Sequence, residues 1–371
     1  MRSFVLDSLD DLKDYRDAWE GLRQECRAPI FSSYDLVYLW LDNYSASVKP
    51  CVILIEDRGE LIGVAPLCTS QHWVMGLPIN TISMVGVQLN LMGYSLYSVF
   101  ARHDESATLR EMLGCVKRAK WNFLLMPALD TNISTLRFQD GICQETDWHP
   151  ANPDLDRSYV FPPEGDIAAD FGKRTRKNLN TIRNKLEREG RMDFQSVKSV
   201  EDAERAMRLY LGQHEERWEK KGGSIVRKPN NSRLLVEMGK LAVKTGTGTI
   251  HELLIDGEVA GQVLCFFDGD VSRAYRQGMT DKFWDLSPGR LVMTLAMEDH
   301  RNRGLRAMDF LHGNEEYKLH MTNNQRALGS VQMTRGPLKL LSRAREFPPL
   351  RGINKRLMSF QDHMMRRAYD D

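Results

Sequence analysis

Residues 285–303 combine a helix start with groups that bind anions. Ser287 can cap a helix, Pro288 suits the first helical position, and Gly289 leaves the first turn open. The free backbone N–H groups and the dipole of such a helix start attract phosphate, and Arg290 adds a positive charge. The pattern predicts a diphosphate site, although Ser-Pro-Gly also begins helices that bind nothing.

Two predicted strands flank this helix in the sequence. Residues 271–279 (VSRAYRQGM) alternate as a strand does, and residues 307–311 (AMDFL) form an apolar run that reads as the next strand. The helical spacing between them ends at Gly304, which suits the position just after a helix. A helix start that follows a strand inside an α/β unit is a favourable place for a phosphate group.

The two halves of the chain repeat the same order of elements. Residues 51–67 and 250–266 each read as an apolar strand, a tight turn and a second apolar strand, with turns at residues 57–59 and at Asp256-Gly257. A helical stretch and a buried strand follow in both halves. This order predicts an α/β chain of two similar domains, unless two unrelated α/β domains look alike by chance.

Length and composition are those of a folded protein with more than one domain. The chain has 371 residues, of which 42% are hydrophobic and 27% charged, and two domains of about 150 residues fit this length. The composition excludes whole-chain disorder, collagen-like repeats and coiled-coil rods. Because 51 Lys and Arg balance 50 Asp and Glu, the global charge indicates neither a nucleic-acid nor a membrane partner.

The sequence contains no targeting or metal motif. The six cysteines are scattered without a CxxC pair, acidic residues follow soon after Met1, and no apolar run approaches the ~18 residues of a membrane span. We therefore expect a reduced, cytoplasmic protein without a transmembrane segment. The nine histidines form neither an HExxH motif nor a Cys/His cluster, so we expect no bound metal.

Positive charge is concentrated in two segments. Residues 152–165, rich in Pro and Asp, are predicted as a linker, and the amphipathic helix at 172–191 carries eight Lys/Arg against two Glu. Residues 335–367 carry nine Lys/Arg against Glu346 and Asp362. Such segments suit an anionic partner, for example a nucleotide sugar, a polyanionic lipid headgroup or a tRNA. The alternative is a solvated helix face and a solubilising tail.

A series of short matches to one protein family runs from about residue 10 to about residue 333. Its members are Trp19, Leu22, residues 29–33, Trp40, residues 63–67, residues 174–179, His214, Arg217, Trp218, Gly222, residues 287–289, residues 309–311, Gly313 and residues 316–318. This ordered series resembles the GNAT superfamily, in particular the acetyltransferases of the CelD/BcsL type, which are related to the Fem peptidyltransferases.

The resemblance implies two tandem GNAT-like domains, each a mixed sheet flanked by helices, of which the first is degenerate. It implies acetyl-CoA or another acyl-CoA as donor, with its pyrophosphate on the turn from Ser287 to Leu291. GNAT loops carry a Gln or Arg ahead of this turn, so the resemblance assigns Gln277 to cofactor binding. The loop of this chain has less glycine than those of the family, and some Fem relatives use aminoacyl-tRNA instead of CoA.

Two residues after the strand at 307–311 are candidates for the chemistry of acyl transfer. The reacting carbonyl needs a hydrogen-bond donor and the leaving group needs a proton. In Fem relatives a lysine in the matching motif is tied to stabilising that carbonyl, and the resemblance assigns this role to Lys318. Tyr317 can protonate a leaving thiolate. The alternatives are a surface lysine after a turn and a tyrosine that packs at a strand end.

Two charged residues on the predicted strands are further candidates. An acidic residue in the middle of a strand, such as Asp309, is costly to bury unless it is paired. It can bind Arg276, hold an acceptor amine or cap a loop. Arg276 can reach a phosphate or carboxylate of an acceptor, or pair with an acidic side chain, and Tyr275 is assigned with it to substrate binding.

His214 and Trp218 are four residues apart on a helix predicted for residues 203–220, so they share one face. An imidazole can act as a base near neutral pH, and the indole can form a wall for an acceptor or for pantetheine. The alternative is a core-facing aromatic pair.

These observations lead to one main hypothesis and two alternatives. The main hypothesis is an acyl-CoA-dependent N- or O-acyltransferase that acts on a small molecule, a sugar or a cell-envelope precursor, for example in polysaccharide biosynthesis. The alternatives are a Fem-like transferase that uses aminoacyl-tRNA and a non-catalytic scaffold of a polysaccharide synthesis complex. The predicted boundaries are 1–150 for the degenerate domain, 151–170 for the linker, 171–335 for the acyltransferase domain and 336–371 for the basic tail.

Overall fold

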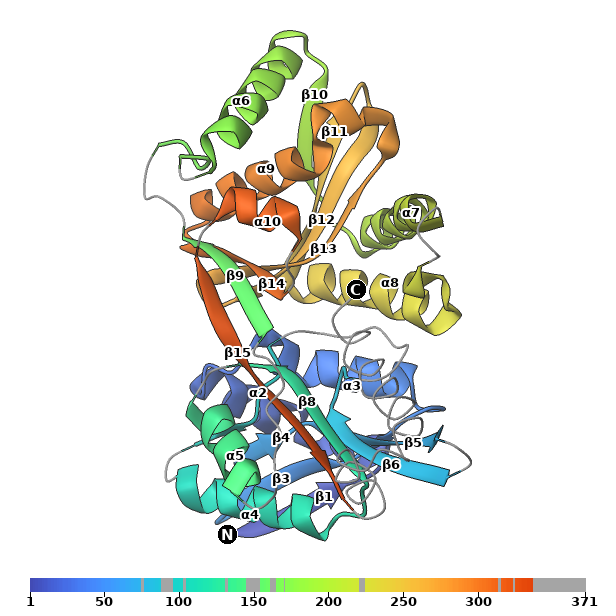
Figure 1. Cartoon of the computed structure of the whole chain (residues 1–371), viewed down its shortest axis with the longest axis vertical. Helices are drawn as coiled ribbons and strands as arrows, with labels where there is room; N and C mark the ends of the chain where they lie inside the picture. Colours follow the sequence, from blue (N-terminus) through green and yellow to red (C-terminus); the bar gives the residue numbers. More distant parts are fainter. Residues whose placement is uncertain are drawn as a thin grey trace, which may run out of the picture. The chain divides into compact units, whose positions relative to one another are not determined.

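The computed structural model divides into two compact units, Met1–Asp154 with the residues from Ala327 onward, and Leu155–Arg326 (Figure 1). It describes residues 1–74, 77–87, 96–102, 105–130, 133–144, 154–160, 165–169, 171–219, 224–312, 315–322 and 324–335. The predicted basic tail at 336–371 lies outside the described residues.

The first unit contains two sheets and five α-helices among its described residues. Its helices are α1 (Leu9–Leu12), α2 (Arg16–Glu25), α3 (Tyr34–Asn43), α4 (Glu105–Arg118) and α5 (Ile133–Gln144). One sheet has the order β1 (Arg2–Leu6), β3 (Val52–Asp57), β4 (Glu60–Ala65), β7 (Phe100–Ala101). The other has the order β15 (Gln325–Thr334), β8 (Phe123–Leu129), β6 (Leu77–Met84), β5 (Leu67–Val74), β2 (Lys49–Pro50).

The second unit is one sheet between two layers of helices (Figure 1). The sheet has the order β10 (Met192–Ser196), β11 (Gly248–Ile255), β12 (Glu258–Asp268), β13 (Val271–Met279), β14 (Ala307–His312), β9 (Asp154–Val160). On one face lie α6 (Lys173–Arg188), α9 (Pro288–Asn302) and α10 (Glu316–Met321). On the other lie α7 (Val200–Glu219) and α8 (Pro229–Thr245). Neighbouring strands are antiparallel except β13 and β14, which are parallel.

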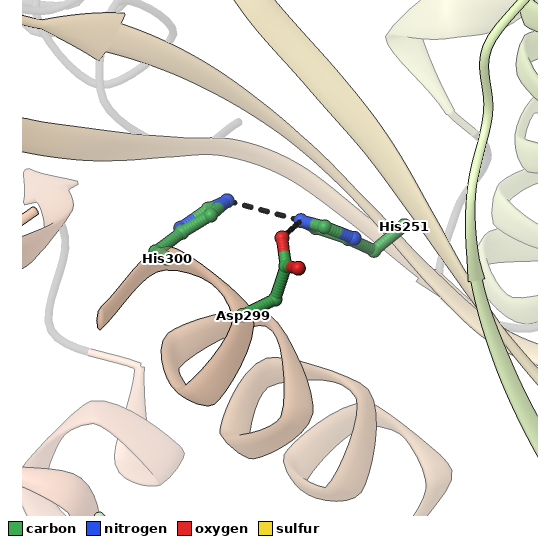
Figure 2. Close-up of side chains that lie close together, drawn as sticks. All are labelled: His251, Asp299 and His300. Atoms are coloured by element: carbon green, nitrogen blue, oxygen red, sulfur yellow. Dashed lines mark hydrogen bonds and ion pairs between the residues drawn. The ribbon is translucent and has the colours of Figure 1, made fainter. Parts of the chain in front are cut away.

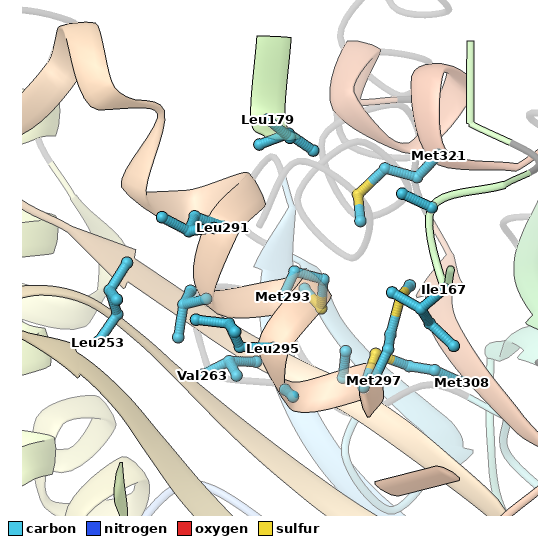
Figure 3. Packing of buried hydrophobic residues seen from close by; sticks show 14 of the residues in the cluster. Ile167, Leu179, Leu253, Val263, Leu291, Met293, Leu295, Met297, Met308 and Met321 are labelled. Atoms are coloured by element: carbon cyan, nitrogen blue, oxygen red, sulfur yellow. The ribbon is translucent and has the colours of Figure 1, made fainter. Parts of the chain in front are cut away.

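The main core of the second unit lies between α9 and the sheet (Figure 3). Because residues 291–297 of α9 are all buried, this helix is a central layer of the unit. It packs on inward-facing strand residues such as Leu253 and Val263, and Leu179 of the amphipathic helix α6 covers it from outside. At ~25 cal/mol per Å² of apolar surface removed from water, this packing stabilises the position of α9 more than any single polar contact does.

The two predicted hairpins are confirmed and share an irregularity that the sequence does not reveal. Arg58-Gly59 and Asp256-Gly257 form the turns, and all four residues have positive φ, as the tightest hairpin turns require. In each hairpin the second strand carries one extra residue, Ile62 in β4 and Ala260 in β12. The same bulge at the same place in both hairpins supports an internal duplication.

A glycine next to each bulge lets a helix approach the hairpin closely. A Cβ on Gly63 would lie 2.6 Å from side-chain atoms of Thr108 and Met112 in α4. A Cβ on Gly261 would lie 3.0 Å from the carbonyl oxygen of Pro288 in α9. The helix that follows the hairpin therefore packs over it through an equivalent glycine in both halves. The predicted mixed α/β fold, with sheets flanked by helices in two similar units, is confirmed.

The connections between the units differ from the sequence-based expectation. The segment predicted as a linker, 151–170, contains β9, which pairs antiparallel with β14 of the second unit. The Pro- and Asp-rich composition of this region conceals the strand. Residues from Ala327 onward belong to the first unit, where β15 pairs antiparallel with β8, whereas the sequence placed residues up to 335 in the second domain.

Candidate functional site

Strands β13 and β14 part shortly after they begin. Their parallel ladder covers three positions, from Val271 opposite Ala307 to Arg273 opposite Asp309. β13 then continues to Met279 paired with β12, but within the described residues it forms no further ladder with β14. The sheet of the second unit is therefore split beyond Arg273.

A bulge in β13 coincides with the split. Cys265 of β12 faces Ala274 and Leu264 faces Arg276, so Tyr275 is an extra residue of β13. A bulge of this kind bends its strand and increases the local twist, which turns β13 away from the direction of β14. The ring of Tyr275 is buried and packs edge-on against Phe266, with 5.8 Å between ring centroids.

The start of α9 presents two unpaired backbone donors. Leu291 N–H donates to the carbonyl of Ser287 at 3.1 Å, and Pro288 has no N–H. The N–H groups of Gly289 and Arg290 have no hydrogen-bond partner in the part of the chain that the structure describes. The expectation that the Ser287 side chain caps the helix is wrong, because this residue has φ of 49° and its hydroxyl makes no capping bond.

Side chains of β13 hold the first turn of α9 in place. The amide of Gln277 donates to the carbonyl of Gly289. A Cβ on Gly289 would lie 3.0 Å from the sulfur of Met279, so the absence of a side chain allows this close contact. Gln277 therefore fixes the position of the helix start, while the unpaired N–H groups of Gly289 and Arg290 remain available to an anion.

Asp309 is paired with Arg273. The carboxylate of Asp309 is buried and forms an ion pair with Arg273 across the last position of the ladder. It also accepts a hydrogen bond from Leu311 N–H at 2.8 Å. Arg273 reaches Asp268 as well, at 3.0 Å. This network closes the end of the split where the two strands are still joined.

Lys318 is buried and its ammonium group is bonded inside the protein. It donates to the carbonyls of Leu311 at 3.3 Å and His312 at 2.8 Å, and it pairs with Glu315 at 2.8 Å. These partners account for all three N–H donors of a lysine. Lys318 therefore holds the end of β14, where Leu311 adopts a left-handed φ of 59°.

Tyr317 lies on the same short helix as Lys318 and packs against the core of the second unit. Burial, and to a smaller extent Glu315, raise the pKa of its hydroxyl well above the usual value, while Arg217 opposes this shift. The hydroxyl is therefore protonated at neutral pH and can serve only as a proton donor or a neutral hydrogen-bond partner.

His214 and Trp218 share one face of α7, as the sequence predicts. Their rings stack with 5.8 Å between centroids. The Nδ1 atom of His214 lies 2.9 Å from the Ser224 hydroxyl. Burial, followed by the charges of Arg276 and Arg217, lowers the pKa of His214 to about 4. The imidazole is therefore neutral at physiological pH.

Two arginines lie near this imidazole on different elements. Arg276 of β13 stacks on the ring of Tyr275 at 4.4 Å, and Arg217 of α7 lies 5.7 Å from the exposed ring of Trp284. The structure thus gathers His214, Arg217 and Arg276 where α7 packs on β13. This close contact requires a glycine at position 278, because a Cβ there would lie 2.9 Å from the ring of Tyr210.

Three contacts of this site involve residues that the sequence did not single out. Ser224 forms a hydrogen bond with His214, and Arg273 forms an ion pair with Asp309. Gly278 allows α7 to pack closely on β13. The register of β13 against β14 decides the second contact, and it cannot be read from composition or spacing. The available signal in the sequence was Arg273, a charged residue within the alternating pattern of VSRAYRQ.

The part of the chain that matches a family model contains this candidate site. Residues 173–319 match the family model of the acetyltransferase (GNAT) domain. The match begins with α6 and ends within α10, so it includes the split between β13 and β14 and the start of α9. These residues form a GNAT-type acetyltransferase domain, and the chain carries an acyltransferase domain.

One solved structure shares the fold along most of the chain, and two others are similar to it with lower TM-scores. A conserved protein of unknown function from Bacteroides thetaiotaomicron is 13% identical, with a TM-score of 0.58 over 89% of this chain and 99% of that chain. FemX is 12% identical, with a TM-score of 0.46 over 92% and 99%. A tandem GNAT protein from the clavulanic acid biosynthesis pathway is 10% identical, with a TM-score of 0.44 over 91% and 99%.

Two further comparisons gave negative results. No curated protein matches the sequence significantly. Among the described residues, no helix combines the length and the hydropathy that crossing a bilayer requires.

Proposed function

We propose that this chain is a cytoplasmic, acyl-CoA-dependent N- or O-acyltransferase of the CelD/BcsL type. The donor is acetyl-CoA or a longer acyl-CoA, and the acceptor is an amine or hydroxyl on a small molecule, a sugar or a cell-envelope precursor. The acceptor attacks the thioester carbonyl directly in a ternary complex, the new C–N or C–O bond replaces the C–S bond, and CoA leaves as the thiol.

One observation carries this proposal: a split parallel strand pair next to a helix start with unpaired N–H groups. The diphosphate of a CoA molecule matches the N–H groups of Gly289 and Arg290, to which the Arg290 side chain adds charge. The ladder between β13 and β14 stops after three positions, and a pantetheine chain can take the place of the missing strand pairing.

The neutral imidazole of His214 is our candidate base. In the tautomer in which Nδ1–H donates to the Ser224 hydroxyl, 2.9 Å away, the Nε2 lone pair can accept the proton that the attacking amine or hydroxyl loses. Tyr317 is our candidate for the proton donor to the departing thiolate, which its neutral hydroxyl can hydrogen-bond; its raised pKa makes it a weaker acid than an ordinary tyrosine. Trp218, Arg276 and Tyr275 are our candidates for contacts with the acceptor.

Lys318 acts in this proposal through β14. Because its three donors already bond Leu311, His312 and Glu315, it positions the backbone of β14 beside the split and does not itself donate to the reacting carbonyl. Asp309 has a similar positioning role through Arg273.

The donor is tested by calorimetric titration of the protein with acetyl-CoA and by thermal unfolding in its presence. We expect stoichiometric binding and an increase in Tm. Arg290→Ala should weaken binding about tenfold, since a hydrogen bond to a charged group contributes about 1.5 kcal/mol or more. Arg301→Ala, at the other end of α9, is the matched control and should bind normally. Absence of binding by the unmodified protein to any acyl-CoA would refute the proposal.

A second candidate function has one observation in its favour. On the exposed face of α6, five cations have no acidic partner among the described residues. They are Lys173, Arg174, Lys177, Lys185 and Arg188. Such a face suits a polyanion, and FemX is among the similar structures, so an aminoacyl-tRNA donor is the alternative.

Salt dependence separates the two donors. Binding of tRNA through these cations should weaken steeply between 50 and 200 mM salt, and Lys173→Glu with Lys177→Glu should abolish it. Binding of acetyl-CoA should be unaffected by the same two substitutions. If the protein binds tRNA but no acyl-CoA, the alternative replaces the main proposal.

A further inference from the structure

A polar cluster inside the second unit lies away from the candidate donor site (Figure 2). His251 projects from β11, and Asp299 and His300 project from the last turn of α9. The two Nε2 atoms of the histidines are 3.0 Å apart. A carboxylate oxygen of Asp299 is 3.5 Å from Nε2 of His251, and one ligand atom from each of the three residues lies within 4.8 Å of the others.

These separations suit a transition metal. With metal–nitrogen and metal–oxygen bonds of about 2.0–2.1 Å at tetrahedral angles, two ligand atoms are about 3.3 Å apart. Two of the three separations, 3.0 and 3.5 Å, lie on either side of this value, and the third is within 4.8 Å. Two imidazoles and a carboxylate are ligands that Zn²⁺ accepts, with a water molecule in the fourth position.

The surroundings fix both imidazole rings. Phe194 stacks on His251 at 5.2 Å, and Phe267 packs edge-on against His300 at 5.3 Å. The Nδ1 atom of His251 lies 3.0 Å from the Ser196 hydroxyl. A hydrogen bond from the second ring nitrogen to a fixed oxygen is what metal-binding histidines usually make, because it holds the tautomer with a free Nε2 lone pair.

The hydrogen bonding of the cluster is incomplete as it stands. His300 is fully buried, and its Nδ1 atom has no hydrogen-bond partner. The Oδ2 atom of Asp299 faces His251 at 3.5 Å and forms an ion pair with Arg303 at 2.7 Å. Buried polar atoms in native proteins are rarely left unpaired, so Nδ1 of His300 is an irregularity of this cluster, whereas the atoms that face one another are the two Nε2 atoms and Oδ2 of Asp299.

We propose that His251, Asp299 and His300 form a Zn²⁺-type metal site that joins the end of α9 to β11. Nε2 of each histidine and Oδ2 of Asp299 are the ligands. Ser196 contacts Nδ1 of His251 on the side away from the ion, and Arg303 contacts the same Oδ2 atom of Asp299, whose second lone pair faces His251. Because the Asp299 side chain is 28% exposed, an ion can reach the site from solvent on that side.

The position of the site argues for a structural role. Asp299 lies ten residues along α9 from Gly289, which corresponds to about 15 Å. The metal therefore does not touch the groups that would bind CoA. It links the C-terminal end of α9 to β11. Because the N-terminal end of α9 carries the candidate donor site, this link stabilises the orientation of the helix at that site.

The test is metal binding by the full chain after dialysis against EDTA. Co²⁺, which gives visible absorption bands in four- and five-coordinate nitrogen and oxygen sites, serves as the spectroscopic probe, and Zn²⁺ competition gives the affinity. We expect one ion per chain and an increase in Tm with Zn²⁺. Asp299→Asn should weaken binding by a factor of ~100 or more, and Ser196→Ala by about tenfold.

The controls separate loss of a ligand from loss of the fold. Asp299→Asn changes a partly exposed side chain with almost no change in shape, and circular dichroism checks that it folds. His320→Ala alters a histidine outside the cluster and should bind Co²⁺ as the unmodified protein does. The proposal is overturned if the unmodified protein binds no ion, or if Asp299→Asn and His300→Gln both bind as tightly as it does. The cluster is then a hydrogen-bonded histidine pair.

Discussion

Arg273 of β13 and Asp309 of β14 face each other at the last paired position of two parallel strands, and their side chains form an ion pair there. Beyond this position the strands part. The same carboxylate accepts a hydrogen bond from Leu311 N–H, which fixes the irregular course of β14 after the split. The pair therefore holds the closed end of the opening in which we place the acyl donor.

Asp309→Asn should destabilise the protein by about 3 kcal/mol, because breaking a buried ion pair leaves the charge of Arg273 with one acidic partner fewer. Urea unfolding of both proteins at pH 7 measures this difference. Asp268 still pairs with Arg273 at 3.0 Å, so we expect a folded variant. A loss below 1 kcal/mol would show that the pair does not hold the strands.

Gly261→Ala should weaken acetyl-CoA binding as well as stability. The new Cβ would lie 3.0 Å from the backbone oxygen of Pro288, and a backbone atom can move away only if the start of α9 moves. We expect a loss of about 2 kcal/mol of folding stability, typical of overpacking, and a Kd for acetyl-CoA that rises at least fivefold. Chemical unfolding and calorimetry check the two effects.

The control for this substitution is Gly212→Ala in α7. No heavy atom lies within 4 Å of a Cβ at Gly212, and alanine is the better helix former by about 1 kcal/mol. This variant should be slightly more stable and bind acetyl-CoA normally. Equal behaviour of the two variants would contradict the role of Gly261 in positioning α9.

Local patterns predicted the elements of the second unit well, because each pattern has a local cause. The alternation in residues 271–279 matches β13, and Pro288 and Gly304 mark the two ends of α9 within one or two residues. The hairpin turns were found from their glycines. β9 was missed, since a strand in a Pro- and Asp-rich stretch gains its stability from pairing with β14, which is not a local property.

The candidate site was predicted as a set of residues but not as a set of contacts. Spacing placed His214 and Trp218 on one helix face, and their rings do stack. The partner of Asp309 depends on the register of β13 and β14, and that of His214 depends on a turn ten residues away. The cluster of His251, Asp299 and His300 joins residues 49 positions apart, so no motif search of the sequence detects it.

Lys318→Ala should reduce turnover strongly while acetyl-CoA still binds. The substitution leaves the carbonyls of Leu311 and His312 without their charged donor, and we expect it to cost about 3 kcal/mol of stability. If Lys318 positions β14, then kcat falls and the Kd for the donor stays within about twofold. Steady-state kinetics and calorimetry below the variant's Tm give both numbers.

Glu315→Gln is the companion variant for Lys318. It removes the negative partner of the ammonium group and keeps the two carbonyl bonds, so most of the turnover should persist. Unchanged turnover in Lys318→Ala would remove this lysine from the site. Equal losses in both variants would instead assign the effect to the ion pair.

His214 should remain neutral across the physiological pH range, so loss of the catalytic base should not appear near pH 6.5. Burial and two arginines lower its pKa to about 4, and a base acts only while it is unprotonated. We therefore expect the acid limb of kcat/KM to lie below pH 5. His214→Gln should lower kcat by ~10²-fold or more and leave the Kd for acetyl-CoA unchanged.

The same pKa shift predicts how stability depends on pH. The unfolded chain protonates His214 near pH 6.5, whereas the folded protein does so only near pH 4, so the unfolded state binds more protons between these values. His214 therefore does not change the stability above about pH 6.5, and it lowers the free energy of unfolding progressively as the pH falls from 6.5 to about 4. Urea unfolding at pH 7 and pH 4.5 should therefore show a larger loss in the unmodified protein than in His214→Gln. The other buried histidines titrate in both proteins, so the difference between them isolates His214, and identical losses would mean that its pKa is not lowered.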